Sequence, residues 1–137
     1  MAAMDLLDVM RKRLEEAGIA DVFTTMPDGR RYPESVTLAF GIPDRKTVYY
    51  DGTTTSPMRV TVIVKRLSEF NAMATAQEAE AVLKSSPLDS ENGSYDLDSV
   101  ETTDPQPLPW DESGRYVWAF DVYIDTRKDF FLSLIHI

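Results

Sequence analysis

A strand pattern that runs directly into a helix pattern constrains this chain more than any other stretch. Residues 58–67 read MRVTVIVKRL, in which Met58, Val60, Val62 and Val64 alternate with residues that are mostly polar. Successive side chains of a strand point to opposite faces, so the four apolar side chains share one face. The pattern predicts a strand that is buried on one side and partly covered on the other, in an antiparallel or mixed sheet.

The residues that follow, 68–84, predict a helix packed on that strand. Ser68 is a suitable N-cap, Glu69 suits the first turn, and Lys84 lies where the helix dipole favours a cation. Small residues allow a helix to approach a sheet closely, so we expect this pair of elements to form the centre of the domain. The apolar stripe of the helix recurs at helical spacing and consists of Ala72, Ala76, Ala79 and Leu83.

Periodicity also predicts a first helix and further strands. Residues 4–17 form a helical pattern that ends at Gly18, and residues 115–125 are expected to pair with the strand at 58–66. The polar run Thr53–Pro57 is expected to be a connection, and residues 104–114, with three prolines, a long loop or hairpin tip. The first helix presents Leu7, Met10, Leu14 and Ala17 on one face. Other strands are expected over 35–42, with Val36, Leu38 and Phe40 inward, over 47–50 and over 94–102.

These elements predict an α+β fold with a mixed, mainly antiparallel sheet of about four to five strands and two α-helices packed on one face. A chain of 137 residues is long enough for one core, and we assign residues 1–129 to a single domain. Residues 130–137, FFLSLIHI, form an apolar tail. This tail could be an edge strand, a segment that binds a neighbouring subunit, or a non-native or disordered appendage.

Composition argues against several kinds of active site. The chain has no cysteine and a single histidine, His136, so disulfides, thiolate sites, Ser-His-Asp triads and multi-histidine metal sites are not expected. No run approaches the roughly 18 consecutive apolar residues that a membrane span needs, and the first residues do not resemble a signal peptide. We therefore expect no membrane contact, no cofactor and no catalytic residue.

The negative charge is concentrated in one half of the chain. Residues 85–125 contain ten acids and one base, Arg115, while the remaining residues contain thirteen of each. Such a surface disfavours nucleic-acid binding and is expected to face a partner or to repel phosphate. The acids are Asp89, Glu91, Asp96, Asp98, Glu101, Asp104, Asp111, Glu112, Asp121 and Asp125.

Three other features were considered as sites. Residues 89–93 (DSENG) are similar to a calcium loop, but the glycine comes one place early and the twelfth position is Val100, so a solvated turn is expected. Arg59, Lys65 and Arg66 are expected to form a basic patch on the outer face of the strand that suits cross-strand partners such as Asp121 or Asp125 better than a phosphate. Trp110 is either an interface anchor or a cover for the sheet edge.

The order of these elements resembles the tail terminator proteins, or minor capsid proteins, of long-tailed bacteriophages. The resemblance covers roughly residues 4–129. It rests on the opening Met4-Asp5-Leu6-Leu7 helix, on PMRVTVIVK at 57–65 passing straight into the helix at 68–83, and on the closing strand at 116–124. None of these pieces is a catalytic fingerprint.

The resemblance implies a structural virion protein at the tail–head junction, assembled in the cytoplasm of the host bacterium. Such proteins form a ring, usually a hexamer, on the last ring of tail-tube protein, end tail polymerisation and join the head connector. DNA would then be passing cargo, and the acids between Asp89 and Glu112 would line or rim the channel. Loops 27–33, 53–57 and 104–114 would contact the partners. The alternative is a small cytoplasmic binding or regulatory domain that uses its sheet face as a ligand platform.

Overall fold

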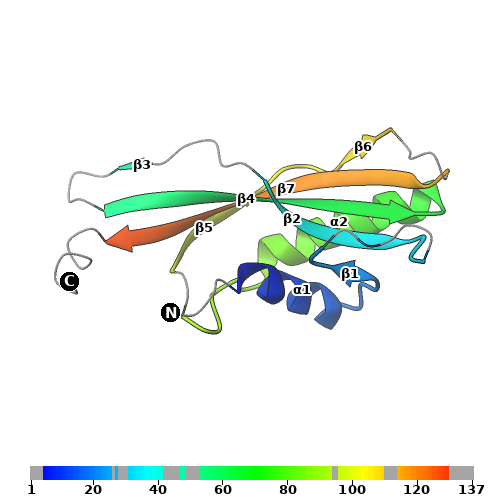
Figure 1. Ribbon diagram of the computed structural model, residues 1–137. Coiled ribbons are helices and arrows are strands. Elements are labelled where there is room, and N and C mark those ends of the chain that lie inside the picture. The colour runs from blue at the N-terminus through cyan, green and yellow to red at the C-terminus, as the bar shows by residue number, and fades with distance from the viewer. Residues whose placement is uncertain are drawn as a thin grey trace.

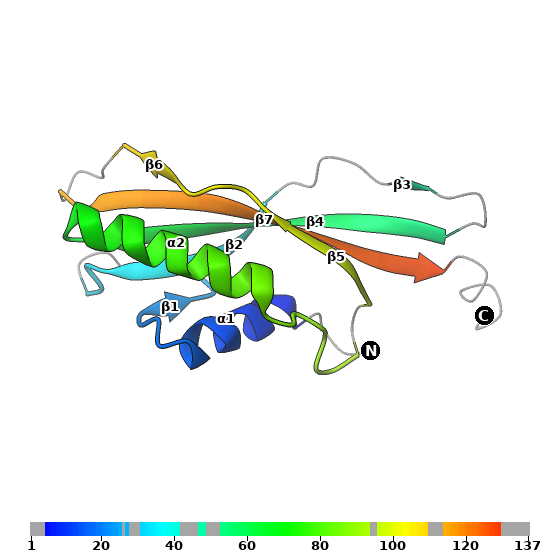
Figure 2. The same ribbon diagram turned by 180° about the vertical axis from the view of Figure 1, so that it is seen from behind.

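The chain folds into one sheet with two helices on the same side of it (Figures 1 and 2). The computed structural model describes residues 5–25, 27, 31–41, 47–48, 53–93, 96–109 and 114–129. The predicted α+β class is confirmed, although the described residues form seven strands rather than four to five. The elements are α1 (Leu6–Glu16), β1 (Val22–Phe23), β2 (Ser35–Gly41), β3 (Thr47–Val48), β4 (Thr53–Arg66), α2 (Glu69–Ser85), β5 (Leu97–Thr102), β6 (Gln106–Leu108) and β7 (Tyr116–Asp129).

The sheet is built around β4 and β7, which are antiparallel and paired along their whole length, from Thr53 opposite Asp129 to Arg66 opposite Tyr116. The strand order is β1-β2-β4-β7-β5, with β3 beside β4 and β6 beside β7. All neighbours are antiparallel except β1 and β2. The predicted pairing of the two strongest strands is therefore confirmed, as is the mixed, mainly antiparallel sheet.

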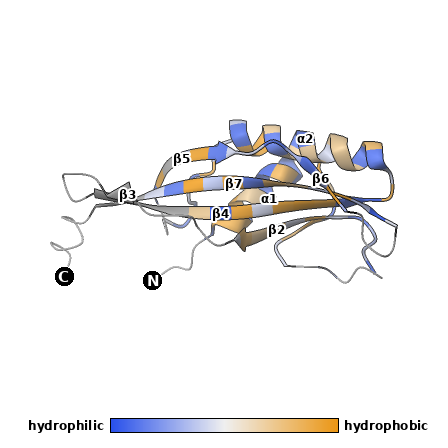
Figure 3. Cartoon of the chain, turned by 90° about the horizontal axis from the view of Figure 1, so that it is seen from above, coloured by the Kyte–Doolittle hydropathy of each residue, from blue (hydrophilic) through white to orange (hydrophobic). Residues whose placement is uncertain are grey.

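The core lies between the helices and one face of the sheet, and its buried residues come mainly from α1, α2, β2, β4 and β7. Figure 3 shows the apolar and polar residues alternating along these elements. Val60, Val62 and Val64 of β4 are fully buried there, which confirms the predicted alternation. The Ser68 side chain accepts a hydrogen bond from the Asn71 amide and caps α2 as expected. The predicted stripe is also buried: Ala72, Ala76, Ala79 and Leu83 have no exposed surface.

α1 packs beside α2 through a face that differs slightly from the predicted one. Met10 and Leu14 are buried as expected, but Val9 joins them and Ala17 is exposed. The reason is that the helix ends at Glu16, and Gly18 then adopts a positive φ of 88°. Ala17 consequently lies in the turn rather than on the buried face.

Three expectations about the sheet need correction. Thr53–Pro57 is not a connection but the first part of β4, so β4 and β7 extend past both helices (Figures 1 and 2). Phe40 was expected inward, yet it is 53% exposed because β2 is an edge strand at that position. The segment 104–114 is also not all loop, since β6 pairs with β7 there.

Within the described residues, no helix is long and apolar enough to cross a membrane. The tail at 130–137 lies outside the part of the chain that the structure describes, and so do residues 28–30 of the first candidate loop.

Candidate interaction surfaces

A polar cluster occupies the face of the sheet that the helices leave open. Arg59 of β4 donates from Nη2 to Oδ2 of Asp121 on β7 at 2.9 Å, and the Thr61 hydroxyl donates to Oδ1 of the same carboxylate at 2.7 Å. The predicted role of Arg59 as a cross-strand partner is therefore confirmed. Lys65 lies on the same side of β4 and is half-buried.

The connection between β5 and β6 is tied to this cluster. Thr103 donates its amide to the Asp121 carbonyl at 2.9 Å and accepts the Asp121 amide on its hydroxyl at 2.8 Å. Asp104 follows and lines an open cavity of about 630 Å³ together with Arg59, Thr61 and Asp121. Asp121 thus organises a polar hollow between β4, β7 and the start of β6.

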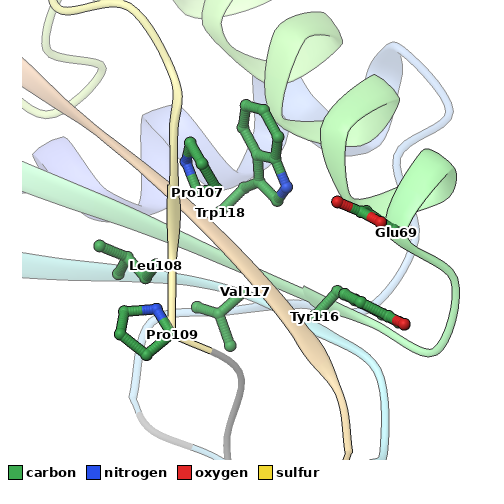
Figure 4. Close-up of a pocket in the computed structure, with 7 residues that line it drawn as sticks. All are labelled: Glu69, Pro107, Leu108, Pro109, Tyr116, Val117 and Trp118. Carbon is green, nitrogen blue, oxygen red and sulfur yellow. The ribbon is translucent and has the colours of Figure 1, made fainter.

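A second pocket, lined mainly by apolar residues, lies at one end of the β4–β7 pair (Figure 4). It has a volume of about 400 Å³ and opens to solvent. Its lining comes from the region of β6, from the start of β7 and from the first turn of α2: Pro107, Leu108, Pro109, Tyr116, Val117, Trp118 and Glu69. Leu108 is 46% exposed, so an apolar side chain remains available at the mouth.

Two more exposed apolar side chains lie at the same end of the molecule. Leu67 is 59% exposed between β4 and α2, and Phe70 is 69% exposed in the first turn of α2. We call the pocket together with Leu67 and Phe70 the apolar pole. Exposed apolar groups that gather around a hollow mark interaction surfaces in soluble proteins. Phe70 was not predicted as a surface residue. The signal was present in the sequence, because Phe70 falls outside the alanine stripe of its helix.

The loop after α2 is fastened to α1 by the Asp5 carboxylate. Oδ2 of Asp5 accepts the amides of Glu91 at 2.9 Å and Asn92 at 3.2 Å, while Oδ1 accepts the Ser90 hydroxyl at 2.9 Å. Lys12 also approaches Glu91, with 2.6 Å between Nζ and Oε2. The hydrogen bond and the charge of Glu91 raise the pKa of Lys12 above its ordinary value. Residues 89–93 were expected to form a solvated turn, but these contacts hold them against α1.

The structure separates the acids that were expected to act together. Asp89 and Glu91 lie in the docked loop near α1, and Glu91 is neutralised by Lys12 and approached by Arg13 at 3.9 Å. Asp96 is exposed just before β5, Asp98 lies within β5, and Asp104 lines the polar hollow. Trp110, Asp111 and Glu112 lie outside the described residues. No group of three or more possible metal ligands occurs in the part of the chain that is described.

A match between this chain and the sequence model of a protein family identifies the family. Residues 3–127 match the model described as bacteriophage tail terminator protein. The chain belongs to this family. Comparison with curated proteins finds no match. Among solved structures, a chain of the virion of a native gene transfer agent particle has the same fold, with a TM-score of 0.70 and 12% identity over 90% of this chain and 95% of that one.

This tail terminator is accordingly a structural protein of the virion tail, as the order of its elements suggested. The family is not a class of enzymes. The candidate surfaces of this terminator are therefore the apolar pole, the polar hollow and the free edges of the sheet.

Proposed function

We propose that this tail terminator forms a ring of six copies that caps the tail tube, ends its polymerisation and joins it to the head connector. The family match, which spans both helices and nearly all of β7, is the observation that supports this function most directly. The ring would align the β4–β7 pair of every copy along the ring axis. Loops and strand ends would then be left for the proteins above and below.

The two ends of the β4–β7 pair suit these axial contacts. A strand of fourteen residues is about 45 Å long, which separates the two ends widely. The apolar pole lies at one end, and the part of the pair that extends past the helices lies at the other. We propose that one end contacts the tail-tube protein and the other the connector protein, so that a single ring bridges both.

The proposal is tested with a tail-tube protein from the same source. Purified tube protein is polymerised with and without the terminator, and tube lengths are measured by electron microscopy. We expect shorter tubes that carry one ring of terminator at a single end. Tubes of unchanged length without a terminal ring contradict the proposed function.

The channel is proposed to be lined by the helix-free face of the sheet. Its described charges include the acids Glu101, Asp104, Asp121 and Asp125 and the bases Arg59 and Lys65, so acids outnumber bases there. An acidic lining does not retain the phosphates of passing DNA, because DNA binding draws its affinity from cations that replace counterions. Asp89 and Glu91 are poorer candidates than first expected, since they lie on the helix side.

A charge exchange tests the position of the channel. Rings carrying Glu101→Lys and Asp104→Lys should retain DNA at low salt and lose it as salt rises, measured by filter binding. The control carries Glu78→Lys and Asp89→Lys, which change the net charge equally but lie at exposed positions on the helix side. Equal DNA retention by both rings contradicts a channel lined by the helix-free face.

A further inference from the structure

One free edge of the sheet is the second half of β2. The Val36 amide donates to the Asp21 carbonyl at 2.8 Å, so the backbone groups of Val36 face β1. Backbone groups alternate along a strand, and those of Leu38 and Phe40 therefore face the same side. β1 pairs only with Val36 and Thr37, and no other described strand lies beside Leu38–Gly41 on that side. The parallel pairing of Phe23 with Thr37 also uses the Leu38 amide, so three groups, the Leu38 carbonyl and both backbone groups of Phe40, point away from the sheet.

This edge lacks the features that normally prevent strand pairing. Edge strands of soluble proteins are usually protected by charged residues, prolines or bulges. β2 reads SVTLAFG and contains no charge and no proline. Phe40, on the helix side of the sheet, also presents an aromatic ring that is 53% exposed. An unprotected edge with an exposed aromatic side chain is suited to bind another strand.

The opposite edge of the sheet is β5, and it also has backbone groups that point away from the sheet. The Thr103 amide donates to the Asp121 carbonyl at 2.9 Å, so Thr103 and Glu101 face β7. By the same alternation, the backbone groups of Val100 and Thr102 point away from β7. Val100 and Thr102 also direct their side chains to the helix side, because they pair with the buried Ile124 and Val122.

The two edges also differ in charge. Residues 85–114, which include β5 and β6, contain eight acids and no base. Residues 19–48, which include β1, β2 and β3, contain four acids and four bases. Those bases come in two pairs, Arg30-Arg31 before β2 and Arg45-Lys46 after it. β5 itself carries Asp98 and Glu101, whereas β2 carries no acid that would repel them.

We propose that the β2 edge of one copy pairs with the β5 edge of the next copy, so that the sheet continues from subunit to subunit. This inference rests on the proposed ring and names its subunit interface. Within one copy β2 runs antiparallel to β4, and β5 runs parallel to β4 because both are antiparallel to β7. A rotation about an axis along the strands preserves their direction, so β5 meets the next β2 in an antiparallel pair.

The pairing gives the exposed groups of both edges a partner. The Leu38 carbonyl and the amide and carbonyl of Phe40 bond backbone groups of β5, and the Phe40 ring packs on the helix side against Val100 and Thr102 of the neighbour. The contact is heterologous, as a closed ring requires. Five strands at a spacing of about 4.8 Å give roughly 24 Å per copy, so six copies enclose a circle about 45 Å across between backbones.

Cysteine cross-linking tests the pairing on a clean background, because the natural chain has no cysteine. The variant with Ala39→Cys and Glu101→Cys places thiols on the helix-free side of the two edges. A short bis-maleimide tolerates a register shift of two residues. In rings formed on tail-tube protein we expect a ladder of cross-linked species that ends at the closed ring. The control, Ala39→Cys with Glu78→Cys, has the second thiol on the exposed side of α2 and should give no ladder.

The possible outcomes separate this interface from the ring itself. Rings that give no ladder, or the same ladder with the control, overturn the β2–β5 pairing and leave the ring. Cross-links from β2 to tube protein alone show that a different partner occupies the edge. A chain that stays monomeric even with tube protein overturns both the interface and the ring.

A second variant tests the interface without cross-linking. Phe40→Asp removes the aromatic ring and adds a charge opposite an acidic edge, so we expect at least a tenfold higher concentration for half-assembly, measured by light scattering. Ala81→Asp adds the same charge at an exposed position on α2, away from both edges and from the apolar pole, and should leave ring assembly unchanged. Both variants alter exposed side chains, and circular dichroism checks that each still folds. Equal effects of the two substitutions contradict the proposed interface.

Discussion

Arg59 and Asp121 form an ion pair of 2.9 Å between β4 and β7 on the helix-free face, and Thr61 bonds the second oxygen of the same carboxylate. Both ionic side chains are partly buried, at 35% and 20% exposure. Asp121→Ala should lower the free energy of unfolding by about 2 kcal/mol, because the partly buried donors of Arg59 and Thr61 lose their acceptor. Asp121→Asn keeps one acceptor oxygen and should cost about half as much.

Urea unfolding followed by circular dichroism measures both changes. The control is Glu101→Ala, an exposed acid on the same face, which should change stability by less than about 0.5 kcal/mol. A loss for Asp121→Ala no larger than that of the control would show that the cluster does not stabilise the sheet.

The ionisation of Lys12 should make the stability of the protein depend on pH in the alkaline range. The hydrogen bond and charge of Glu91 raise the pKa of Lys12 when the chain folds. A group whose pKa is raised on folding stabilises the protein fully below its unfolded pKa of 10.5 and loses this effect as pH rises through the folded value. Wild type should therefore exceed Lys12→Gln in stability at pH 8, and the difference should disappear towards pH 12.

The measurement is the urea midpoint of both proteins across this pH range. Because tyrosines also ionise in this range, only the difference between the two proteins is informative. The control uses a Glu91→Gln background, in which Lys12 has lost its anionic partner, so adding Lys12→Gln there should no longer give the pH-dependent difference. A difference that persists unchanged at high pH contradicts the assignment to Lys12.

Asp5 should hold the loop after α2 in place. Its carboxylate accepts two amides and one hydroxyl from Ser90, Glu91 and Asn92. Removal of these charge-assisted bonds by Asp5→Ala should lower the free energy of unfolding by about 1–3 kcal/mol. Hydrogen exchange at the amides of Glu91 and Asn92 should also accelerate.

The exchange measurement distinguishes a local effect from general destabilisation. Amides in the middle of β4 report the global opening and should accelerate only by the measured loss of stability. Asp8→Ala changes another acid of the same helix, one that faces solvent, and should leave the loop amides unaffected. Unchanged loop exchange in the Asp5 variant rules out the tether.

The alanine stripe of α2 should not accept larger residues. Ala76 has no exposed surface and lies between the helix and the sheet. Ala76→Leu adds three carbon atoms to a filled space and should destabilise the protein by about 1–3 kcal/mol. Ala81→Leu makes the same substitution on the exposed side of the helix and should remain within about 0.5 kcal/mol of wild type. The thermal unfolding midpoints of both variants, compared with that of wild type, test this prediction.

The centre of the fold was predictable because its signals are local and periodic. Val60, Val62 and Val64 repeat at the period of a strand, and Ser68 followed by the alanine stripe marks a helix start and one face. The same periodicity identified β7. These segments have no competing turn residues, so pattern and structure agree.

Pro57 explains why the start of β4 was assigned to a connection. Odd-numbered residues of β4 direct their backbone groups towards β2, and β2 reaches only as far as Arg59. At Pro57 no described strand lies on that side, so the missing amide costs no ladder bond and the strand continues through the proline. A sequence alone does not reveal where a neighbouring strand stops.

The surfaces were predictable only in part, because they combine residues that are distant along the chain. The apolar pole joins Glu69 and Phe70 of α2 with Leu108 and Tyr116, and only the pairing of β6 with β7 brings them together. The tether between Asp5 and Glu91 likewise spans most of the chain. Charge counts identified an acidic half correctly, but the folded chain divides its acids between two sides of the sheet.

The full-length pairing of β4 with β7 has a consequence for synthesis of the protein. The partner of Thr53 is Asp129, so the central ladder cannot close until the last described strand has left the ribosome. Until then the valines of β4 are not paired with β7. A chain dominated by such distant pairings folds slowly, and its hydrophobic surface is exposed to aggregation in the meantime. Fragments that stop before residue 116 should therefore depend on chaperones or precipitate.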